Sequence, residues 1–145
     1  MNPSAIKMRL RSAKGFTLLE LLVVLLIIAL LAGYVGPKVL SYSDRAKVQA
    51  AHAQMKTLGD ALIQYRLDTG SYPSKQDGLQ SLVTQPTGVV GWHGPYLAKS
   101  VPVDPWNRAY EYNIPGRESE VEIVSLGRDG QTGGTGNDAD IVIGL

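Results

Sequence analysis

The chain has 145 residues and no cysteine, with 14 lysines and arginines against 13 aspartates and glutamates. Because a domain takes roughly 100–200 residues, this length allows one compact unit with an appendage and argues against a two-domain enzyme. The lack of cysteine excludes a disulfide scaffold, a cysteine nucleophile, an iron–sulfur cluster and a thiolate zinc site. Four of the 14 positive charges and no acid lie in the first 15 residues, so the remainder carries 10 positive against 13 negative charges. That balance argues against a general nucleic-acid binder.

A long apolar stretch follows the basic N-terminus. No charged residue occurs from Leu21 to Pro37, and the 22 residues that begin at Phe16 are interrupted only by Thr17 and Glu20. About 20 apolar residues span a bilayer as a helix. Since positive charges concentrate before this stretch, the sequence predicts a cytoplasmic N-terminus and a C-terminal domain across the membrane.

A secretory signal peptide has a similar form, a basic region followed by an apolar core. Here the apolar run is longer than a usual signal core and no A-x-A cleavage site follows it, so an uncleaved signal anchor is the plainer alternative. Glu20 changes this assessment, because a carboxylate in a membrane helix costs a few kcal/mol and needs a partner. A cut between Gly15 and Phe16 would place a new α-amino group about one helical turn from Glu20.

The junction before the apolar run reads Lys14-Gly15-Phe16-Thr17-Leu18-Leu19-Glu20. This string resembles the class III leader junction of type IV pilins and pseudopilins. The resemblance implies that prepilin peptidase cuts after Gly15 and that Phe16 becomes N-methylated. It also implies that Glu20 pairs with the N-terminal amine of an adjacent subunit during filament growth.

A second, amphipathic helical stretch follows the apolar one. Its apolar residues recur at spacings of three and four, at Val48, Ala51, Met55, Leu58, Leu62 and Tyr65. Gly33, Gly36 and Pro37 predict a kink or a meltable stretch between the two. Gly70 is a natural C-terminal cap, so we expect one helix from about residue 16 to 68.

The C-terminal part predicts a small antiparallel sheet on the amphipathic stripe, and hence an α+β fold. Residues 70–105 are rich in proline and glycine and predict an ordered loop with one short helix at 77–84. Strand-like stretches at 109–114 and 121–126 flank Pro115-Gly116 and predict a hairpin, and 141–143 predicts a last strand.

Several further strings narrow the resemblance to the major pseudopilin of type II secretion systems. They are Tyr72-Pro73, Asp77-Gly78-Leu79, Val103-Asp104-Pro105-Trp106, Tyr110-Glu111-Tyr112, Ser125-Leu126-Gly127-Arg128-Asp129-Gly130, Gly133-Gly134 and Ala139-Asp140-Ile141. The resemblance implies a pilin-like fold with a cytoplasmic leader (1–15), a transmembrane and assembly helix (16–37) and a periplasmic globular domain (38–145). Within that domain we expect a helix (38–68), a loop (69–105) and a sheet with a calcium loop (106–145).

The glycine-rich segment 129–140 contains three acids, Asp129, Asp138 and Asp140. Calcium takes six to eight oxygen ligands, and glycine lets backbone carbonyls turn inward. The spacing is not that of an EF-hand, and composition alone favours a solvated turn with scattered acids over a metal site. The pseudopilin resemblance instead implies a calcium site formed by the carbonyls of Leu126 and Arg128 and the carboxylates of the three acids.

No catalytic motif accompanies the two histidines, so we expect no enzyme activity. We interpret His52 as a surface or groove residue and His93, beside Trp92, as a loop packing residue. The resemblance implies an inner-membrane subunit that forms a helical homo-oligomeric filament and works with prepilin peptidase, minor pseudopilins and an inner-membrane assembly platform to export folded proteins. The alternatives are a type IV pilus subunit for adhesion or DNA uptake, and an uncut, membrane-anchored binding module with a pocket in residues 70–105.

Overall fold

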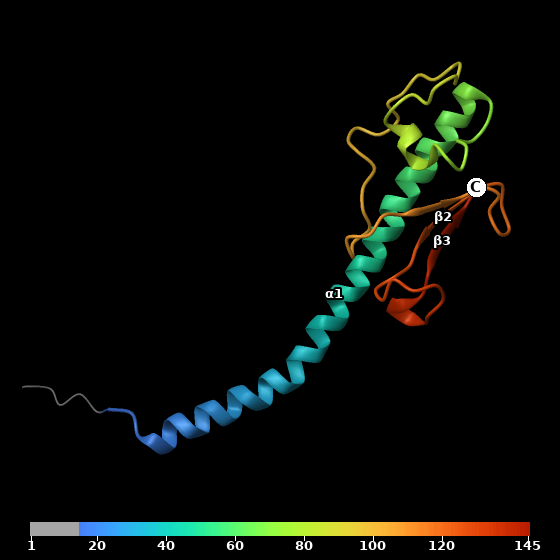
Figure 1. The fold of residues 1–145 in the computed structure, drawn as a ribbon. Coiled ribbons are helices and arrows are strands. Elements are labelled where there is room, and N and C mark those ends of the chain that lie inside the picture. Colours follow the sequence, from blue (N-terminus) through green and yellow to red (C-terminus); the bar gives the residue numbers. More distant parts are fainter. Residues whose placement is uncertain (1–14) are drawn as a thin grey trace, which may run out of the picture. The chain divides into compact units, whose positions relative to one another are not determined.

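The structure is a computed structural model that describes residues 15–145, without the side chains of residues 36–41. The predicted leader, apart from Gly15, therefore lies outside the described residues. The elements are α1 (Leu18–Thr69), the 3₁₀ helix η1 (Gly78–Leu82), β1 (Glu111–Asn113), β2 (Glu122–Ser125), the 3₁₀ helix η2 (Gly136–Asp138) and β3 (Ile141–Gly144) (Figure 1). The chain divides between Val39 and Leu40 into two compact units.

Helix α1 has the extent that the sequence predicts, to within two residues at each end. The helix stops at Gly70, which is left-handed with a φ of 87°. Gly70 donates its N–H to the carbonyl of Arg66 at 2.8 Å. This is the capping role predicted for Gly70, since only glycine adopts that conformation without steric cost. The backbone stays helical through Gly36 and Pro37, so the predicted meltable stretch is not melted in this structure.

The described part of the first unit contains the apolar half of α1. One helix in the described part of the chain is long and apolar enough to cross a membrane, and its span is Leu18–Val35. None of that span is buried within the chain. An apolar helix that exposes its whole circumference needs lipid or other apolar helices around it.

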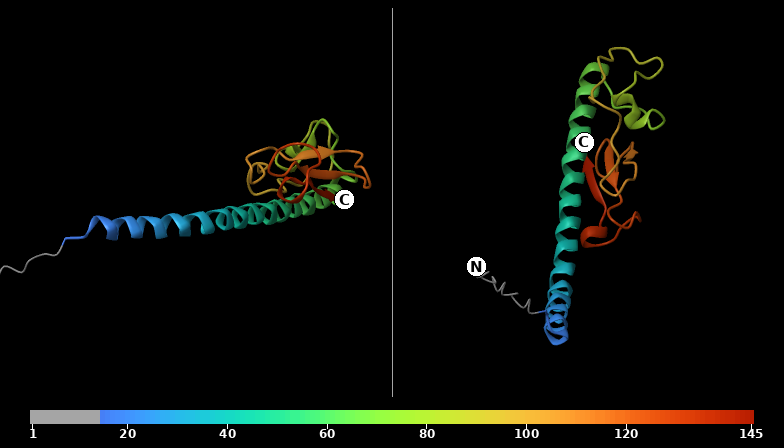
Figure 2. Two further views of the ribbon diagram at one scale, coloured as in Figure 1. Left: turned by 90° about the horizontal axis from the view of Figure 1, so that it is seen from below. Right: turned by 90° about the vertical axis from the view of Figure 1, so that its left-hand side faces the viewer.

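The second unit forms its core between α1 and the sheet. The predicted stripe is confirmed: Ala51, Met55, Leu58 and Leu62 are fully buried, Tyr65 is nearly so, and Val48 packs partly against them. The opposing layer supplies a second set of buried side chains, which comprises Leu79, Leu82, Tyr110, Val121, Ile123 and Ile141. Figure 2 shows the sheet and loops on one side of the C-terminal half of α1.

The sheet has three antiparallel strands in the order β1-β2-β3. Tyr112 pairs with Ile123 across the hairpin, and Ile123 pairs in turn with Ile143. The hairpin and the last strand are confirmed, but the first strand is shorter than predicted. Its first predicted residue, Ala109, instead forms an isolated bridge with Val103.

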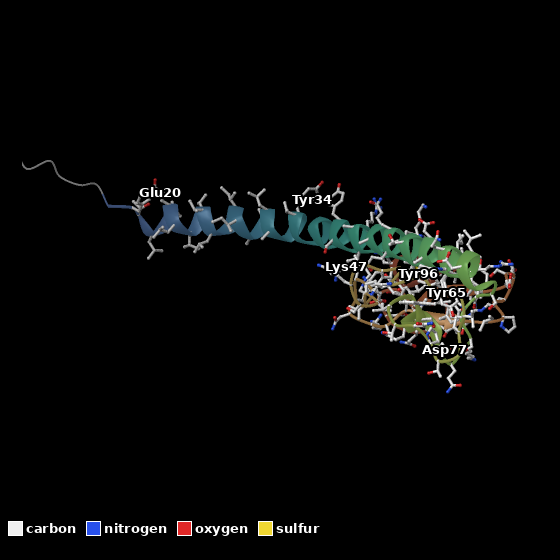
Figure 3. All side chains as sticks on the ribbon, turned by 90° about the horizontal axis from the view of Figure 1, so that it is seen from above. Glu20, Tyr34, Lys47, Tyr65, Asp77 and Tyr96 are labelled. Atoms are coloured by element: carbon white, nitrogen blue, oxygen red, sulfur yellow. The ribbon has the colours of Figure 1, made fainter. Side chains whose placement is uncertain are left out.

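The long loop is anchored to the end of α1 by aromatic side chains. The Tyr96 hydroxyl donates to Asp68 of α1 at 2.8 Å, while Trp92 ties the loop to η1 by donating its indole N–H to the carbonyl of Ser81 at 2.9 Å. The rings of Tyr65 and Tyr96 meet edge-on, with centroids 5.7 Å apart (Figure 3). The prediction that His93 packs in the loop is wrong, because its side chain is 75% exposed.

Candidate functional site

The junction singled out in the sequence lies at the start of α1. Gly15 and Phe16 lie just before the helix, separated from its first residue, Leu18, by Thr17, and Phe16 is 76% exposed. The Thr17 hydroxyl accepts the N–H of Glu20 at 3.2 Å, and the Glu20 carboxylate accepts the N–H of Thr17 at 3.4 Å. These reciprocal bonds form a capping box, which satisfies two N–H groups that the first helical turn leaves unpaired.

The capping box gives Glu20 a partner within its own chain, which the sequence reasoning missed. That reasoning sought a cation for the carboxylate, whereas the structure shows a backbone N–H. The signal was present, because a threonine followed three residues later by a glutamate is the usual pattern of a capping box. Glu20 therefore starts the helix in the uncut chain, in addition to any role between subunits.

The second candidate site is the C-terminal loop, residues 126–140, between β2 and β3. Gly127 has a φ of 64°, and a Cβ built there would lie 2.7 Å from the carbonyl oxygen of Ala139. Only glycine permits this close approach of the two ends of the loop. The bond from the N–H of Arg128 to the carbonyl of Asn137, at 3.0 Å, closes the same junction.

The three acids of the loop have different partners. Asp129 accepts the N–H of Gln131 at 3.0 Å through one oxygen. One oxygen of Asp140 accepts the N–H of Gly133 at 2.9 Å, while the other, Oδ1, is buried and has no hydrogen-bond partner among the described residues. A buried carboxylate oxygen without a donor is costly, so Asp140 Oδ1 is the atom of this loop that most needs a cation.

Asp138 is paired with Arg128. The guanidinium donates from Nε to one carboxylate oxygen at 2.7 Å and from Nη2 to the other at 3.0 Å. This hydrogen bonding lowers the pKa of Asp138 and raises the pKa of Arg128. Bidentate pairs of this kind are among the stronger side-chain hydrogen bonds.

The two carbonyls implied as metal ligands also have partners. The carbonyl of Leu126 accepts the N–H of Gly130 at 3.2 Å. The Arg108 guanidinium donates to the carbonyl of Arg128 at 2.8 Å and to that of Gly127 at 2.6 Å. Arg108 was not identified from the sequence, where nothing marks it as a partner of this loop.

Buried Asp104 holds the turn that presents Arg108. Its carboxylate accepts the N–H groups of Trp106 and Arg108 and the hydroxyl of Ser125, at 3.0, 2.8 and 2.8 Å. All three of these hydrogen-bond donors to the Asp104 carboxylate belong to the protein itself. The turn fixes the 104–108 segment against β2 and the loop.

The structure does not gather the three loop acids into one cluster. Among the side chains described in residues 15–145, no group of three acidic or histidine residues could hold a metal ion by itself. Any cation in this loop would draw on backbone carbonyls in addition to carboxylates, as calcium does readily.

A long helix, apolar in its first half and packed in its second half on a small antiparallel sheet, defines a pilin-like subunit. The family model described as "Type II secretion system (T2SS), protein G" matches residues 38–144, and the prokaryotic N-terminal methylation motif matches residues 10–35. The chain therefore belongs to the protein G family, the major pseudopilins of type II secretion systems.

Individual relatives agree with this assignment. The type II secretion system core protein G of Pseudomonas aeruginosa is 44% identical over 137 residues, which cover 92% of this chain and 96% of the relative. The Vibrio cholerae protein of the same name is 40% identical, with 92% of each chain covered. The crystal structure of the major pseudopilin of enterohaemorrhagic Escherichia coli matches with a TM-score of 0.60 and 32% identity, over 71% of this chain and 90% of that one.

Proposed function

We propose that this pseudopilin is cut between Gly15 and Phe16 by prepilin peptidase, methylated at Phe16 and polymerised into a helical periplasmic filament. The observation that carries the proposal is the N-terminal methylation motif over residues 10–35, which ends at the last residue of an apolar span with no cover of its own. Lipid can cover that span before assembly, and the same span of neighbouring copies can cover it afterwards.

Glu20 has two successive partners in this proposal. In the uncut chain it accepts the N–H of Thr17. Cleavage creates a positively charged α-amino group at Phe16, and a neighbouring subunit can offer that group to Glu20 at matching depth. An ion pair in an apolar environment is strongly favoured over two separate charges there, so the pair would set the axial register of the filament.

The proposed setting is the bacterial inner membrane, with the N-terminus in the cytoplasm and the domain from residue 38 onward in the periplasm. Minor pseudopilins and an inner-membrane assembly platform would begin and drive assembly. Growth of the filament would then push folded proteins across the outer membrane. The role of the chain in this filament is structural.

The first test measures the mass and N-terminal sequence of the protein recovered from cells that contain their own membrane peptidases. We expect a chain that begins with N-methylated Phe16. Glu20→Gln should be cut normally, because glutamine also completes a capping box, but should reduce filament yield by about tenfold or more through loss of the charge pair. An intact Met1 would contradict the cleavage after Gly15. Normal filament yield from Glu20→Gln would contradict the charge pair of Glu20.

We further propose that the C-terminal loop binds calcium through the carbonyls of Leu126 and Arg128 and the carboxylates of Asp129, Asp138 and Asp140. Asp140 fits this role best, since its buried Oδ1 has no donor among the described residues 15–145. Asp138 would have to share or leave its pair with Arg128. Calcium would supply the positive charge that the orphaned oxygen lacks, and would stabilise the folded loop because it binds only the folded form.

The calcium proposal predicts that the melting temperature of the full chain in detergent rises when calcium replaces a chelator. At a concentration 100 times Kd the gain would be about 2.7 kcal/mol. Asp140→Asn and Asp129→Ala should each lose most of this gain, while Asp60→Asn, an exposed acid on α1, should keep it. A wild-type chain with equal stability in calcium and in chelator would contradict the site.

A further inference from the structure

Arg128 makes a second ion pair besides the one within its loop. While Nε and Nη2 bind Asp138, Nη1 donates to Asp44 of α1 at 3.0 Å. Asp44 and Arg128 are 84 positions apart in the chain, and both belong to the second unit. One guanidinium thus joins the C-terminal loop to the long helix.

The burial of the three side chains suits a structural link. The side chains of Asp44 and Asp138 are 20% and 31% exposed, and that of Arg128 is 49% exposed. The Lys56–Asp60 pair, by contrast, lies on one face of α1 with side chains 73% and 65% exposed. Less water around the Arg128 pairs means weaker screening, and the planar guanidinium can bind both acids at once, so it loses less side-chain entropy for each hydrogen bond.

The backbone around Arg128 is already fixed by other bonds. Its N–H donates to the carbonyl of Asn137 at 3.0 Å, and its carbonyl accepts from Arg108 at 2.8 Å. The side chain is therefore held at its base, so that its far end reaches Asp138 and Asp44 at a low entropic cost. All of these bonds form between groups of the protein itself.

We infer that Arg128 is a metal-independent latch that fastens the C-terminal loop to α1 through Asp138 and Asp44. The latch keeps residues 129–140 ordered when no cation is bound, and it fixes the loop at the start of the periplasmic part of α1. This inference goes beyond the calcium proposal and does not depend on it. Its test is therefore made in a chelator.

The test measures amide hydrogen exchange of residues 129–140 in the full chain, in detergent micelles with a chelator. In Arg128→Ala these amides should exchange about threefold to tenfold faster than in the wild type, because local opening becomes easier. Asp44→Asn should accelerate the same amides, although the substitution lies on α1. Lys56→Ala removes an ion pair of α1 that does not touch the loop, and should leave them unchanged.

Each result of the exchange experiment either supports or overturns the latch. Unchanged exchange in Arg128→Ala, or a wild-type loop that exchanges like unstructured peptide in the chelator, would overturn the latch. Acceleration in Arg128→Ala but not in Asp44→Asn would overturn the link to α1 and leave only a clamp within the loop. None of these readings requires calcium to bind, so failure of the calcium site and failure of the latch are distinguishable.

Discussion

Two tyrosines, Tyr110 directly before β1 and Tyr112 within it, connect the sheet side of the second unit to α1 and to the start of the long loop. The hydroxyl of Tyr110 donates to the Gln54 side chain at 2.5 Å, and that of Tyr112 donates to the carbonyl of Pro73 at 2.8 Å. Burial, with a smaller contribution from Asp104, raises the pKa of Tyr110 to about 12. Burial also raises the pKa of Tyr112.

These shifts predict a loss of stability at alkaline pH. Above pH 10 the unfolded chain releases the tyrosine protons while the folded chain keeps them, so the folded state binds more protons. The contribution of Tyr110 is therefore fully present below pH 10 and is lost as the pH rises from 10 to about 12. Tyr110→Phe should flatten the fall of melting temperature over that window, whereas Tyr42→Phe, which alters an exposed tyrosine, should not.

Tyr110→Phe should also lower the free energy of unfolding at neutral pH by about 1 kcal/mol, because it removes the hydrogen bond to Gln54. Thermal unfolding of the wild type, Tyr110→Phe and Tyr42→Phe from pH 7 to pH 12 checks both the loss at neutral pH and the flatter alkaline slope. If Tyr110→Phe followed the wild-type curve between pH 10 and 12, burial of this hydroxyl would not govern the alkaline limit.

The long loop meets the end of α1 at Gly91. Gly91 has a φ of 82°, and a Cβ built there would lie 2.5 Å from the carbonyl oxygen of Asp68. Gly88 has nearly the same φ, 81°, but open space around the Cβ position. Comparing alanine substitutions at Gly91 and Gly88 therefore separates the backbone cost of a left-handed residue from the steric cost of a Cβ that touches α1.

Gly91→Ala should therefore destabilise the fold more than Gly88→Ala does. Both variants pay for a left-handed alanine, about 1 kcal/mol, but only the first must also move the loop away from α1. We expect an additional loss of about 1–3 kcal/mol for Gly91→Ala, as for other overpacked sites. Urea unfolding of both variants measures the difference, and equal losses would show that the loop does not depend on this close approach.

At the scale of the whole molecule, the second unit contains all the buried apolar residues of the described chain. The described core runs from Ala51 to Ile141, whereas the span Leu18–Val35 is entirely exposed. Packing, more than intrinsic propensity, stabilises a helix in a protein, so the core of the second unit is enough to stabilise the second half of α1.

Residues 40–145 should consequently fold without the apolar half. We expect helical circular dichroism, a cooperative thermal transition and a monomer by analytical ultracentrifugation. Leu62→Ala in the same fragment should cost about 2–5 kcal/mol, because Leu62 is fully buried. A non-cooperative transition, or a fragment that needs detergent to stay in solution, would mean that the apolar half contributes to the fold of this unit.

The sequence by itself determined the features that rest on local pattern. The apolar span, the helical stripe from Val48 to Tyr65, the Gly70 cap and the hairpin all follow from hydrophobic period and turn residues, which neighbouring positions decide. The structure confirms each of them, and the comparisons confirm the family that the leader string and the C-terminal strings resemble.

Only the tertiary structure decided which polar groups meet. The pairing of Arg128 with Asp44 and Asp138, the clamp of Arg108 on two carbonyls and the orphaned oxygen of Asp140 leave no periodic trace in the sequence. A guanidinium reaches any acceptor that folding brings near, however distant in the chain. Tertiary packing of the loop against α1 therefore determines which of these polar groups pair, whereas the periodicity of hydrophobic residues determines the helix and strands that carry them.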